Sequence, residues 1–280
     1  MYRFIKSDEI YEKAKELLEN IHFNLPKDVI SALKKAKENE KNSNAQIVLE
    51  ILLENAEIAK SKKIPICQDC GIVIAFLDIG QNVCVKGDVE EAINRAIKDV
   101  YSKFFLRKSV VRDPMMRINT EDNTPAIIHF NFVPGNKLKL NIMVKGFGSE
   151  NASIVKNLLP TISEEELTSE IINHIKSYAP NACPPLIIGI GMGGTLEKAS
   201  YIAKRAVFRP IGERNKDPYY SRLEEMLLEE VNKLDIGPSG LGGKTTALSV
   251  NIETYPTHIA GFPLAINMQC CAVRYGSVEL

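Results

Sequence analysis

A cysteine-containing turn in the first third of the chain places the tightest limits on its fold and chemistry. The turn spans residues 65–71, PICQDCG, and joins a long helical segment to an apolar run, residues 72–76. An apolar run bounded by glycine and proline is typical of a buried strand. The turn therefore presents a thiol, an amide and a carboxylate at the start of a rigid strand, where they can bind a soft metal and move a proton. The alternative is that Cys67 and Cys70 are two small buried side chains.

Composition narrows the class of protein. The chain has 280 residues, with 45% hydrophobic and 25% charged side chains, as in ordinary globular proteins. Basic and acidic residues both number 35, so no basic excess points to nucleic acid or to an anionic membrane. No apolar stretch is long enough to span a bilayer, and the N-terminus shows no secretory signal. We expect a cytoplasmic protein without disulfides, so its six cysteines need burial, metal binding or catalysis as their reason.

The spacing of apolar residues and caps predicts an alternation of helices and strands. Helices are predicted over residues 7–22, 27 onward, 43–60, 88–105, 163–177, 196–207 and 218–234, with caps at Ser7, Ser43, Asp88, Ser163 and Asp217. In the helix 43–60, five apolar residues are expected to pack on a core: Ile47, Val48, Ile51, Leu52 and Ile58. Two strands, 126–133 and 137–144, are predicted to form a β-hairpin, and further strands follow at 186–191 and 248–252. The expected fold is mixed α/β (α+β), with β-sheets flanked by helices in one domain, residues 1–280, or in two sub-lobes.

A polar loop follows the predicted helix 88–105. Residues 106–125 carry three arginines and little apolar periodicity. Loops of this length in a compact domain are often functional, and the guanidinium groups of Arg107, Arg112 and Arg117 suit carboxylate or phosphate recognition. The alternative is a solvated loop whose arginines pair with local acids.

Two glycine-rich loops resemble nucleotide-binding motifs. Gly189, Gly191 and Gly194 satisfy G-x-G-x-x-G between a strand and a helix. We rank a dinucleotide site low, because a further helix follows where a strand ending in an acid is required. A helix N-terminus facing an anion explains the loop better. The segment ending in Lys244-Thr245 has Pro238 where a phosphate-binding loop needs glycine, and the segment before it is predicted to be a helix where a strand is needed, so we rank a Walker A loop low.

Three cysteines in separate thirds of the chain, Cys67, Cys183 and Cys270, each lie in or beside a turn next to an apolar strand. If they converge, three thiolates and an open fourth position suit a [4Fe–4S] cluster with one iron free for substrate. The alternative is a zinc site from Cys67, Cys70, Cys270 and Cys271. Zinc sites usually use two C-x₂₋₄-C pairs, which adjacent Cys270 and Cys271 fit poorly.

Several stretches between residues 65 and 270 together carry a family resemblance. They read PICQDCG, LRKSVVRDP with NTEDNTP, KGFGSEN, NACPPLIIGIGMGGT, GPSGLGGKTT and HIAGFPLAINMQC. As a set they resemble the alpha subunit, or N-terminal half, of the iron–sulfur hydro-lyases, class I fumarate hydratase and L-tartrate dehydratase. The resemblance implies a [4Fe–4S] cluster held by Cys67, Cys183 and Cys270, with one iron not bound by cysteine. It implies reversible hydration of fumarate to (S)-malate, or dehydration of L-tartrate as the alternative.

The resemblance also implies which residues meet the substrate. Gln68 and Asp69 would face it, with Asp69 in the proton-transfer machinery. Arg107 would bind a substrate carboxylate, the amide of Gly148 would line the pocket, and His258 would hydrogen-bond the substrate.

This chain departs from the family pattern at two positions, and it lacks the second catalytic domain of the single-chain members. The family usually has threonine where this chain has Cys70, and Cys271 adds a thiol beside a ligand. Cys270 is preferred over Cys271 because His258 precedes it by twelve residues, as in the family. Since single-chain members carry a second catalytic domain, the resemblance implies a separate beta subunit and a dimer of alpha/beta pairs. A structural metal-binding module without catalysis remains the alternative from a different class.

Overall fold

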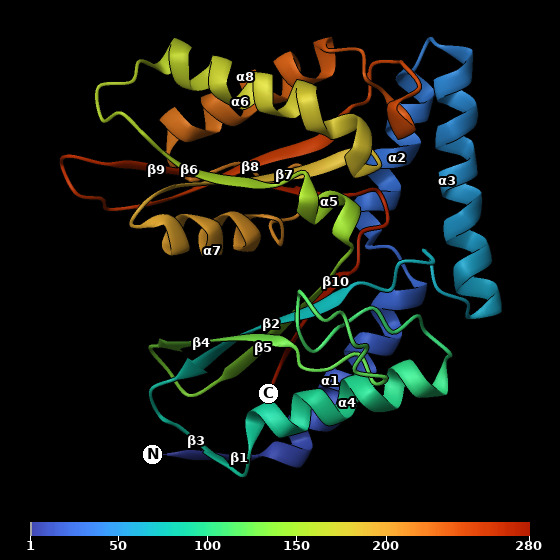
Figure 1. Ribbon diagram of the computed structural model, residues 1–280, viewed down its shortest axis with the longest axis vertical. Helices are drawn as coiled ribbons and strands as arrows, with labels where there is room; N and C mark the ends of the chain where they lie inside the picture. Colours follow the sequence, from blue (N-terminus) through green and yellow to red (C-terminus); the bar gives the residue numbers. More distant parts are fainter. Residues whose placement is uncertain (1) are drawn as a thin grey trace. The chain divides into compact units, whose positions relative to one another are not determined.

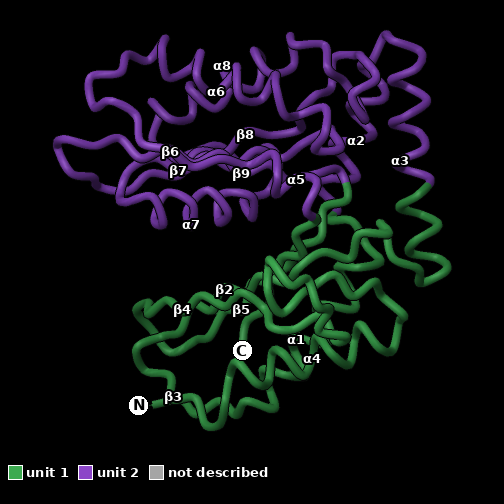
Figure 2. Tube along the Cα trace, in the orientation of Figure 1, with its two compact units in different colours: residues 1–26, 55–146, 272–280 green, residues 27–54, 147–271 purple. Residues whose placement is uncertain are grey.

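The computed structural model describes residues 2–280 and confirms a mixed α/β fold (Figure 1). The chain forms two compact units (Figure 2). Unit 1 consists of the chain up to Pro26 together with residues 55–146 and 272–280. Unit 2 consists of residues 27–54 and 147–271. Among the described residues, no helix is both long and apolar enough to cross a lipid bilayer.

The main sheet of unit 1 corrects one prediction. Its order is β10 (Tyr275–Glu279), β5 (Leu138–Lys145), β2 (Ile72–Gly80) and β4 (Ile127–Val133). β2 pairs antiparallel with β5 and parallel with β4. The predicted strands are therefore present, but the predicted hairpin is wrong, because β2 lies between β4 and β5. β2 is apolar along most of its length and is stabilised by a neighbouring strand on each side.

Two helices cover one face of this sheet, α1 (Ser7–Phe23) and α4 (Val89–Lys103) (Figure 1). Their buried side chains pack with those of β2 and β5 in one core. The predicted cap of α4 is confirmed, since the Asp88 carboxylate accepts the Glu91 amide at 3.0 Å. The predicted cap of α1 is wrong. Ser7 is already helical, because the short strand β1 (Arg3–Lys6), paired with β3 (Val83–Lys86), leads directly into the helix.

Two helices of the N-terminal region follow, α2 (Lys27–Asn39) and α3 (Ser43–Lys62). Asn42 caps α3 in place of Ser43, since its side-chain oxygen accepts the amides of Asn44 and Ala45. The predicted core face of α3 is only partly right. Ile47 and Ile51 are each 55% exposed, and Val48, Leu52 and Ile58 are half-buried. The buried positions are Ala45, Leu49, Ala56 and Ala59.

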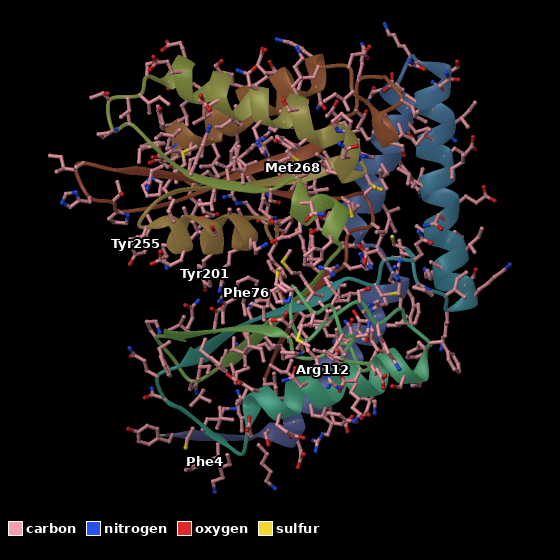
Figure 3. The ribbon with its side chains drawn as sticks, viewed as in Figure 1. Phe4, Phe76, Arg112, Tyr201, Tyr255 and Met268 are labelled. Atoms are coloured by element: carbon pink, nitrogen blue, oxygen red, sulfur yellow. The ribbon has the colours of Figure 1, made fainter. Side chains whose placement is uncertain are left out.

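Unit 2 is a three-layer structure around the sheet β6 (Ile154–Leu158), β9 (Phe262–Gln269), β7 (Leu186–Gly193) and β8 (Ala247–Tyr255). One face is covered by α7 (Leu196–Ala206) and the other by α6 (Glu164–Tyr178) and α8 (Pro218–Lys233) (Figure 1). Met268 lies in the core beneath α6 and α8 (Figure 3). The predicted caps of both helices are confirmed: Ser163 accepts the Glu166 amide, and Asp217 accepts the Tyr219 amide.

The first glycine loop serves helix packing. A β-carbon at Gly189 would lie 2.1 Å from the carbonyl oxygen of Ala203, and one at Gly191 would lie 2.0 Å from that of Ala199. Contacts this short are not possible, so only glycine lets α7 lie directly on β7. The two glycines are therefore explained by close helix–strand packing without a nucleotide.

The second glycine loop is tied to the turn between α2 and α3. Its short 3₁₀ helix, Pro238–Gly240, is followed by Lys244, whose amide donates to the buried Glu40 carboxylate at 2.8 Å. A β-carbon at Gly243 would lie 2.5 Å from that of Ala45. The glycines here allow two loops of unit 2 to approach closely.

Candidate functional site

The turn of residues 67–71 lies in unit 1 and is held by its backbone. Three consecutive carbonyl oxygens, at residues 69, 70 and 71, accept hydrogen bonds from side chains that are 0–1% exposed. The donors, in that order, are Arg274 Nη1 at 2.5 Å, Tyr101 Oη at 2.5 Å and Asn123 Nδ2 at 3.1 Å. A tight turn lacks helix or sheet partners for these oxygens, so buried donors must supply them.

The residues on either side fix the two ends of the turn. The Ile66 amide donates to the His22 carbonyl at 3.0 Å, and Asn55 donates its side-chain amide to the Ile66 carbonyl at 2.9 Å. Gly71 has a φ of 60°, and a β-carbon there would lie 2.5 Å from the Lys145 carbonyl oxygen. Only glycine can leave the turn in this direction.

This backbone presents the first three predicted site residues together. Cys67 and Asp69 are half-buried, and Gln68 is exposed. Asp69 Oδ1 accepts the amide of Gly71 at 2.9 Å, which fixes the plane of the carboxylate. Asp69 Oδ2 lies 3.0 Å from where a β-carbon at Gly146 would be. Gly146 therefore leaves room for the Asp69 carboxylate.

Cys70 has a structural role that the sequence left open. Its side chain is completely buried, and its sulfur accepts the Arg107 amide at 3.3 Å. Burial raises the pKa of the Cys70 thiol, so the protonated form is favoured. A buried thiol that is used in this way is a poor metal ligand, which argues against the zinc alternative with Cys67 and Cys70.

A buried positive charge lies beneath the turn. Arg274 is 1% exposed, and its Nε and Nη2 groups have no hydrogen-bond partner in the structure. Burial, aided by the Arg274 charge, lowers the pKa of His22 from 6.5 to about 4, so this histidine is neutral. His22 Nδ1 donates to the Leu18 carbonyl at 2.8 Å, and its ring meets Tyr101 edge to face at 5.2 Å. Burial also raises the pKa of Tyr101.

The arginine-rich loop is confirmed as a loop, with a single isolated β-bridge between Val111 and Asn119. Figure 3 shows Arg112 within it. Its three arginines, at 107, 112 and 117, are all exposed. None of them forms an ion pair with an acid among residues 2–280, so the alternative of locally paired arginines is wrong. Their guanidinium groups remain available to bind an anion.

Unit 2 contains two of the three cysteines predicted to be cluster ligands, Cys183 and Cys270, on neighbouring segments. Cys183 follows the 3₁₀ helix Ala179–Ala182 and has a φ of 54°, an uncommon conformation for a residue with a β-carbon. Its carbonyl oxygen accepts the amide of Cys271 at 3.0 Å, so Cys183 lies beside the segment that carries Cys270. Cys183 is exposed and Cys270 is 8% exposed. Backbone strain at a predicted ligand is typical of functional positions.

The remaining predicted residues also belong to unit 2. Gly148 is exposed in the short helix α5 (Phe147–Asn151). His258 is exposed in the loop between β8 and β9, where its Nδ1 accepts the Ala260 amide at 3.2 Å. A pocket of about 170 Å³ is lined in part by Glu150 of α5 and Lys204 of α7, which form an ion pair with N–O distances of 2.6 and 2.7 Å.

The donor set suits an iron–sulfur cluster by its chemistry. Cys67, Cys183 and Cys270 are thiols on turns, and thiolates are the ligands of such clusters. Within each unit taken by itself, the described residues contain no group of three His, Cys, Asp or Glu side chains arranged as a metal site. Cys67 belongs to unit 1 and the other two to unit 2. A cluster held by all three stays a prediction.

Sequence reasoning missed the residues that support the turn from below: His22, Tyr101, Asn123 and Arg274. The only available signal was for Asn123, which lies in the motif NTEDNTP and is therefore close to a functional loop. Arg274 follows Cys270 by four residues but carries no local pattern.

Comparison with known proteins shows which family this chain resembles. The family model described as fumarate hydratase (fumerase) matches residues 11–279. A putative L(+)-tartrate dehydratase subunit alpha from Methanocaldococcus jannaschii is 37% identical over 266 residues, covering 92% of this chain and 93% of the relative. The L(+)-tartrate dehydratase subunit alpha of Escherichia coli is 29% identical over 258 residues, covering 91% of this chain and 85% of the relative.

Proposed function

The chain belongs to the fumarate hydratase family, and from this premise we propose that it is the alpha subunit of a two-subunit hydro-lyase acting on a four-carbon dicarboxylate. The reaction we propose is the reversible addition of water to fumarate, giving (S)-malate. One observation carries this proposal. The turn of residues 67–71 holds a thiol, an amide and a carboxylate on a fixed backbone and is bonded directly to the backbone of Arg107.

In this proposal the chain's own residues bind and orient the substrate. The Arg107 guanidinium binds one carboxylate by paired hydrogen bonds, and the Gln68 amide and the Gly148 amide hydrogen-bond to it from the other elements. His258 donates or accepts a further hydrogen bond, with its ring oriented by the Ala260 amide. Holding the double bond in one place relative to the proton-transfer group supplies much of the rate enhancement of such enzymes.

Asp69 is the proton-transfer group in this proposal. Its carboxylate moves a proton to or from the substrate carbon as water is added or removed. The Gly71 amide fixes Oδ1, so the carboxylate keeps one orientation through the reaction. A general acid or base must hold such a geometry to within hydrogen-bonding distance of the reacting atom.

We propose that Cys67, Cys183 and Cys270 hold a [4Fe–4S] cluster. When bound, a cluster with one iron not held by cysteine supplies a Lewis acid for a hydroxyl and a carboxylate oxygen. Cys271 is the alternative third ligand, and the choice of Cys270 rests on the twelve-residue spacing from His258.

L-tartrate is the second candidate substrate, because the relatives named above are tartrate dehydratase alpha subunits. The two substrates differ in hydroxyl groups, and part of the discrimination is expected to come from the partner. The name "subunit alpha" in these relatives supports a separate beta subunit with the second catalytic domain. We propose that the two subunits assemble as a dimer of alpha/beta pairs in the cytoplasm.

The experiment that tests this function begins without oxygen. The chain, co-expressed with its partner subunit and reconstituted with iron and sulfide, is assayed for hydration of fumarate and for dehydration of L-tartrate. In parallel, iron and sulfide are counted in single Cys→Ser variants. We expect about four irons per chain, lost in the variants of Cys67, Cys183 and Cys270. Cys84, which is exposed on β3, is the matched control and should keep its iron.

Turnover of fumarate alone identifies a fumarate hydratase, and turnover of L-tartrate alone identifies the second candidate. A complex that holds its full cluster and converts neither compound contradicts the proposed function. Zinc retained through Cys67 and Cys70, with no iron uptake, would leave the structural module as the better explanation.

A further inference from the structure

One buried amide side chain connects the loop that carries Arg107 to the turn that carries Asp69. Asn123 is 0% exposed. Its Oδ1 accepts the amides of Ser109 and Val110, at 2.7 and 3.3 Å. Its Nδ2 donates to the Gly71 carbonyl at 3.1 Å. A single side chain therefore connects the turn to residues 109 and 110, two and three positions after Arg107.

The thiol of Cys70 makes a second connection at the same place. Its sulfur accepts the amide of Arg107 at 3.3 Å, while its backbone carbonyl accepts the hydroxyl of Tyr101 at 2.5 Å. The residue immediately after Asp69 is thus bonded to Arg107 itself. Both connections lie within unit 1, and the side chains of Asn123 and Cys70 are completely buried, so a lost hydrogen bond leaves a buried group unsatisfied.

We propose that Asn123 and Cys70 are positioning residues that hold the Arg107 guanidinium in register with Gln68 and Asp69. The proposal rests on the proposed function, in which Arg107 binds a substrate carboxylate. Neither residue touches the substrate. Each acts through the backbone of residues 107–110, so its loss weakens substrate binding before it affects proton transfer.

The loop needs such connections because it contains little regular secondary structure. It has no helix and a single isolated β-bridge, and three of its residues have a left-handed backbone: Arg117, Glu121 and Asn123. A mobile arginine must be ordered when the substrate binds, and this ordering reduces affinity. Asparagine also tolerates the left-handed conformation, with a φ of 65° at position 123, better than most residues.

The first test is the variant Asn123→Asp in the cluster-loaded complex with the partner subunit. Aspartate keeps the oxygen that accepts the loop amides and loses the donor to Gly71. We expect KM for the dicarboxylate to rise about tenfold, equal to 1.4 kcal/mol, with kcat within about threefold of wild type and iron content unchanged. The matched control is Asn119→Asp, which loses a donor to the Lys108 carbonyl in the same loop without contacting the turn. Its KM should stay within about twofold.

A second pair of variants covers the case in which a buried charge at position 123 prevents folding. Cys70→Thr and Cys70→Val are nearly equal in shape and differ in the hydroxyl that can accept the Arg107 amide. We expect the threonine variant to retain the wild-type KM and the valine variant to raise it about tenfold. An equal KM in the two variants overturns the proposal for Cys70.

A measurement without substrate separates this inference from the proposed function. Trypsin cleaves after the basic residues of the loop, and its rate reports how firmly the loop is held. In the full chain, we expect faster cleavage between residues 107 and 117 for Asn123→Asp and for Cys70→Val, and wild-type cleavage for Cys70→Thr. If wild type converts neither dicarboxylate, the proposed function fails while this result still decides whether the connections hold the loop. Unchanged cleavage, a rise in KM equal to that of Asn119→Asp, or loss of iron in these variants would overturn the positioning role.

Discussion

The buried histidine beneath the turn makes the stability of unit 1 depend on pH. His22 is 0% exposed and donates Nδ1 to the Leu18 carbonyl. Burial, followed by the Arg274 charge, lowers the His22 pKa from 6.5 to about 4. Between these values the unfolded chain binds a proton that the folded chain does not. The free energy of unfolding therefore falls as the pH falls from 6.5 toward 4, and the full contribution is present above 6.5.

The size of the effect follows from the shift in pKa. Between pH 7 and pH 5, His22 alone should reduce the free energy of unfolding by about 2 kcal/mol, and by about 3 kcal/mol when the pH reaches 4. Acidic residues also titrate in this range, so the contribution of His22 has to be isolated by a variant. His22→Asn removes the ionisable ring and keeps a side-chain amide that can donate to the Leu18 carbonyl.

The assay compares wild type and His22→Asn at pH 7 and pH 5. Urea unfolding followed by circular dichroism gives the global free energy. Hydrogen exchange of the peptide that covers α1 reports the opening of unit 1 alone. Wild type should lose about 2 kcal/mol more than the variant between the two pH values, whatever the cost of the substitution at pH 7. The same substitution at the exposed His258 is the control and should leave the wild-type pH dependence in α1 intact.

Equal pH dependence in wild type and His22→Asn would refute the reasoning. It would mean that His22 takes up its proton in the folded state, through water access or movement of Arg274. Nuclear magnetic resonance titration of the histidine rings provides an independent reading, since a His22 resonance that titrates near 6.5 contradicts burial as the dominant cause.

Three further changes test the packing of each unit. Gly189→Ala places a β-carbon 2.1 Å from a carbonyl oxygen of α7 and should destabilise unit 2 by about 1–3 kcal/mol, with a lower melting temperature in calorimetry; an unchanged melting temperature contradicts the close packing. Arg209→Met leaves the completely buried carboxylate of Glu224 without its charged partner and should cost about 3–5 kcal/mol in urea unfolding; an unchanged free energy of unfolding would contradict the need for that partner. Asp88→Ala removes the cap of α4 and should cost about 1 kcal/mol, measured as faster hydrogen exchange in its first turn.

The sequence predicted those features that depend on neighbouring residues. The caps Asp88, Ser163 and Asp217 were confirmed because a cap joins residues two or three positions apart. The predicted caps Ser7 and Ser43 were wrong, and the cause again lies in the neighbouring residues. An asparagine precedes the second of them and a strand precedes the first, so each helix starts from a different residue.

Strand pairing could not be predicted in the same way. The strands at 126–133 and 137–144 have a turn of hairpin length between them, and local reasoning pairs them. The structure instead inserts β2, which is apolar on both faces and gains a hydrogen-bonded neighbour at each edge. The competing partner lies more than fifty residues away in sequence, as in the pair of Asp78 with Asn131. No pattern within either strand encodes that choice.

The candidate site shows the same difference between local features, which could be predicted, and contacts between distant residues, which could not. The predicted site residues stood out because their types are unusual at their positions: a thiol beside an amide and a carboxylate, and three arginines in one polar loop. The donors that hold the turn lie 31, 52 and 205 residues from the carbonyls they bond, and Tyr101, Asn123 and Arg274 are ordinary residue types. The sequence does predict that such donors are needed. A turn between a helix and a buried strand has carbonyl oxygens without helix or sheet partners, so buried side chains from elsewhere in the chain must donate to them. Of the three donors, only Asn123 also accepts two amides of the loop that carries Arg107. Because Asn123→Asp changes only the donor nitrogen to an oxygen, we expect this substitution to weaken substrate binding without preventing folding.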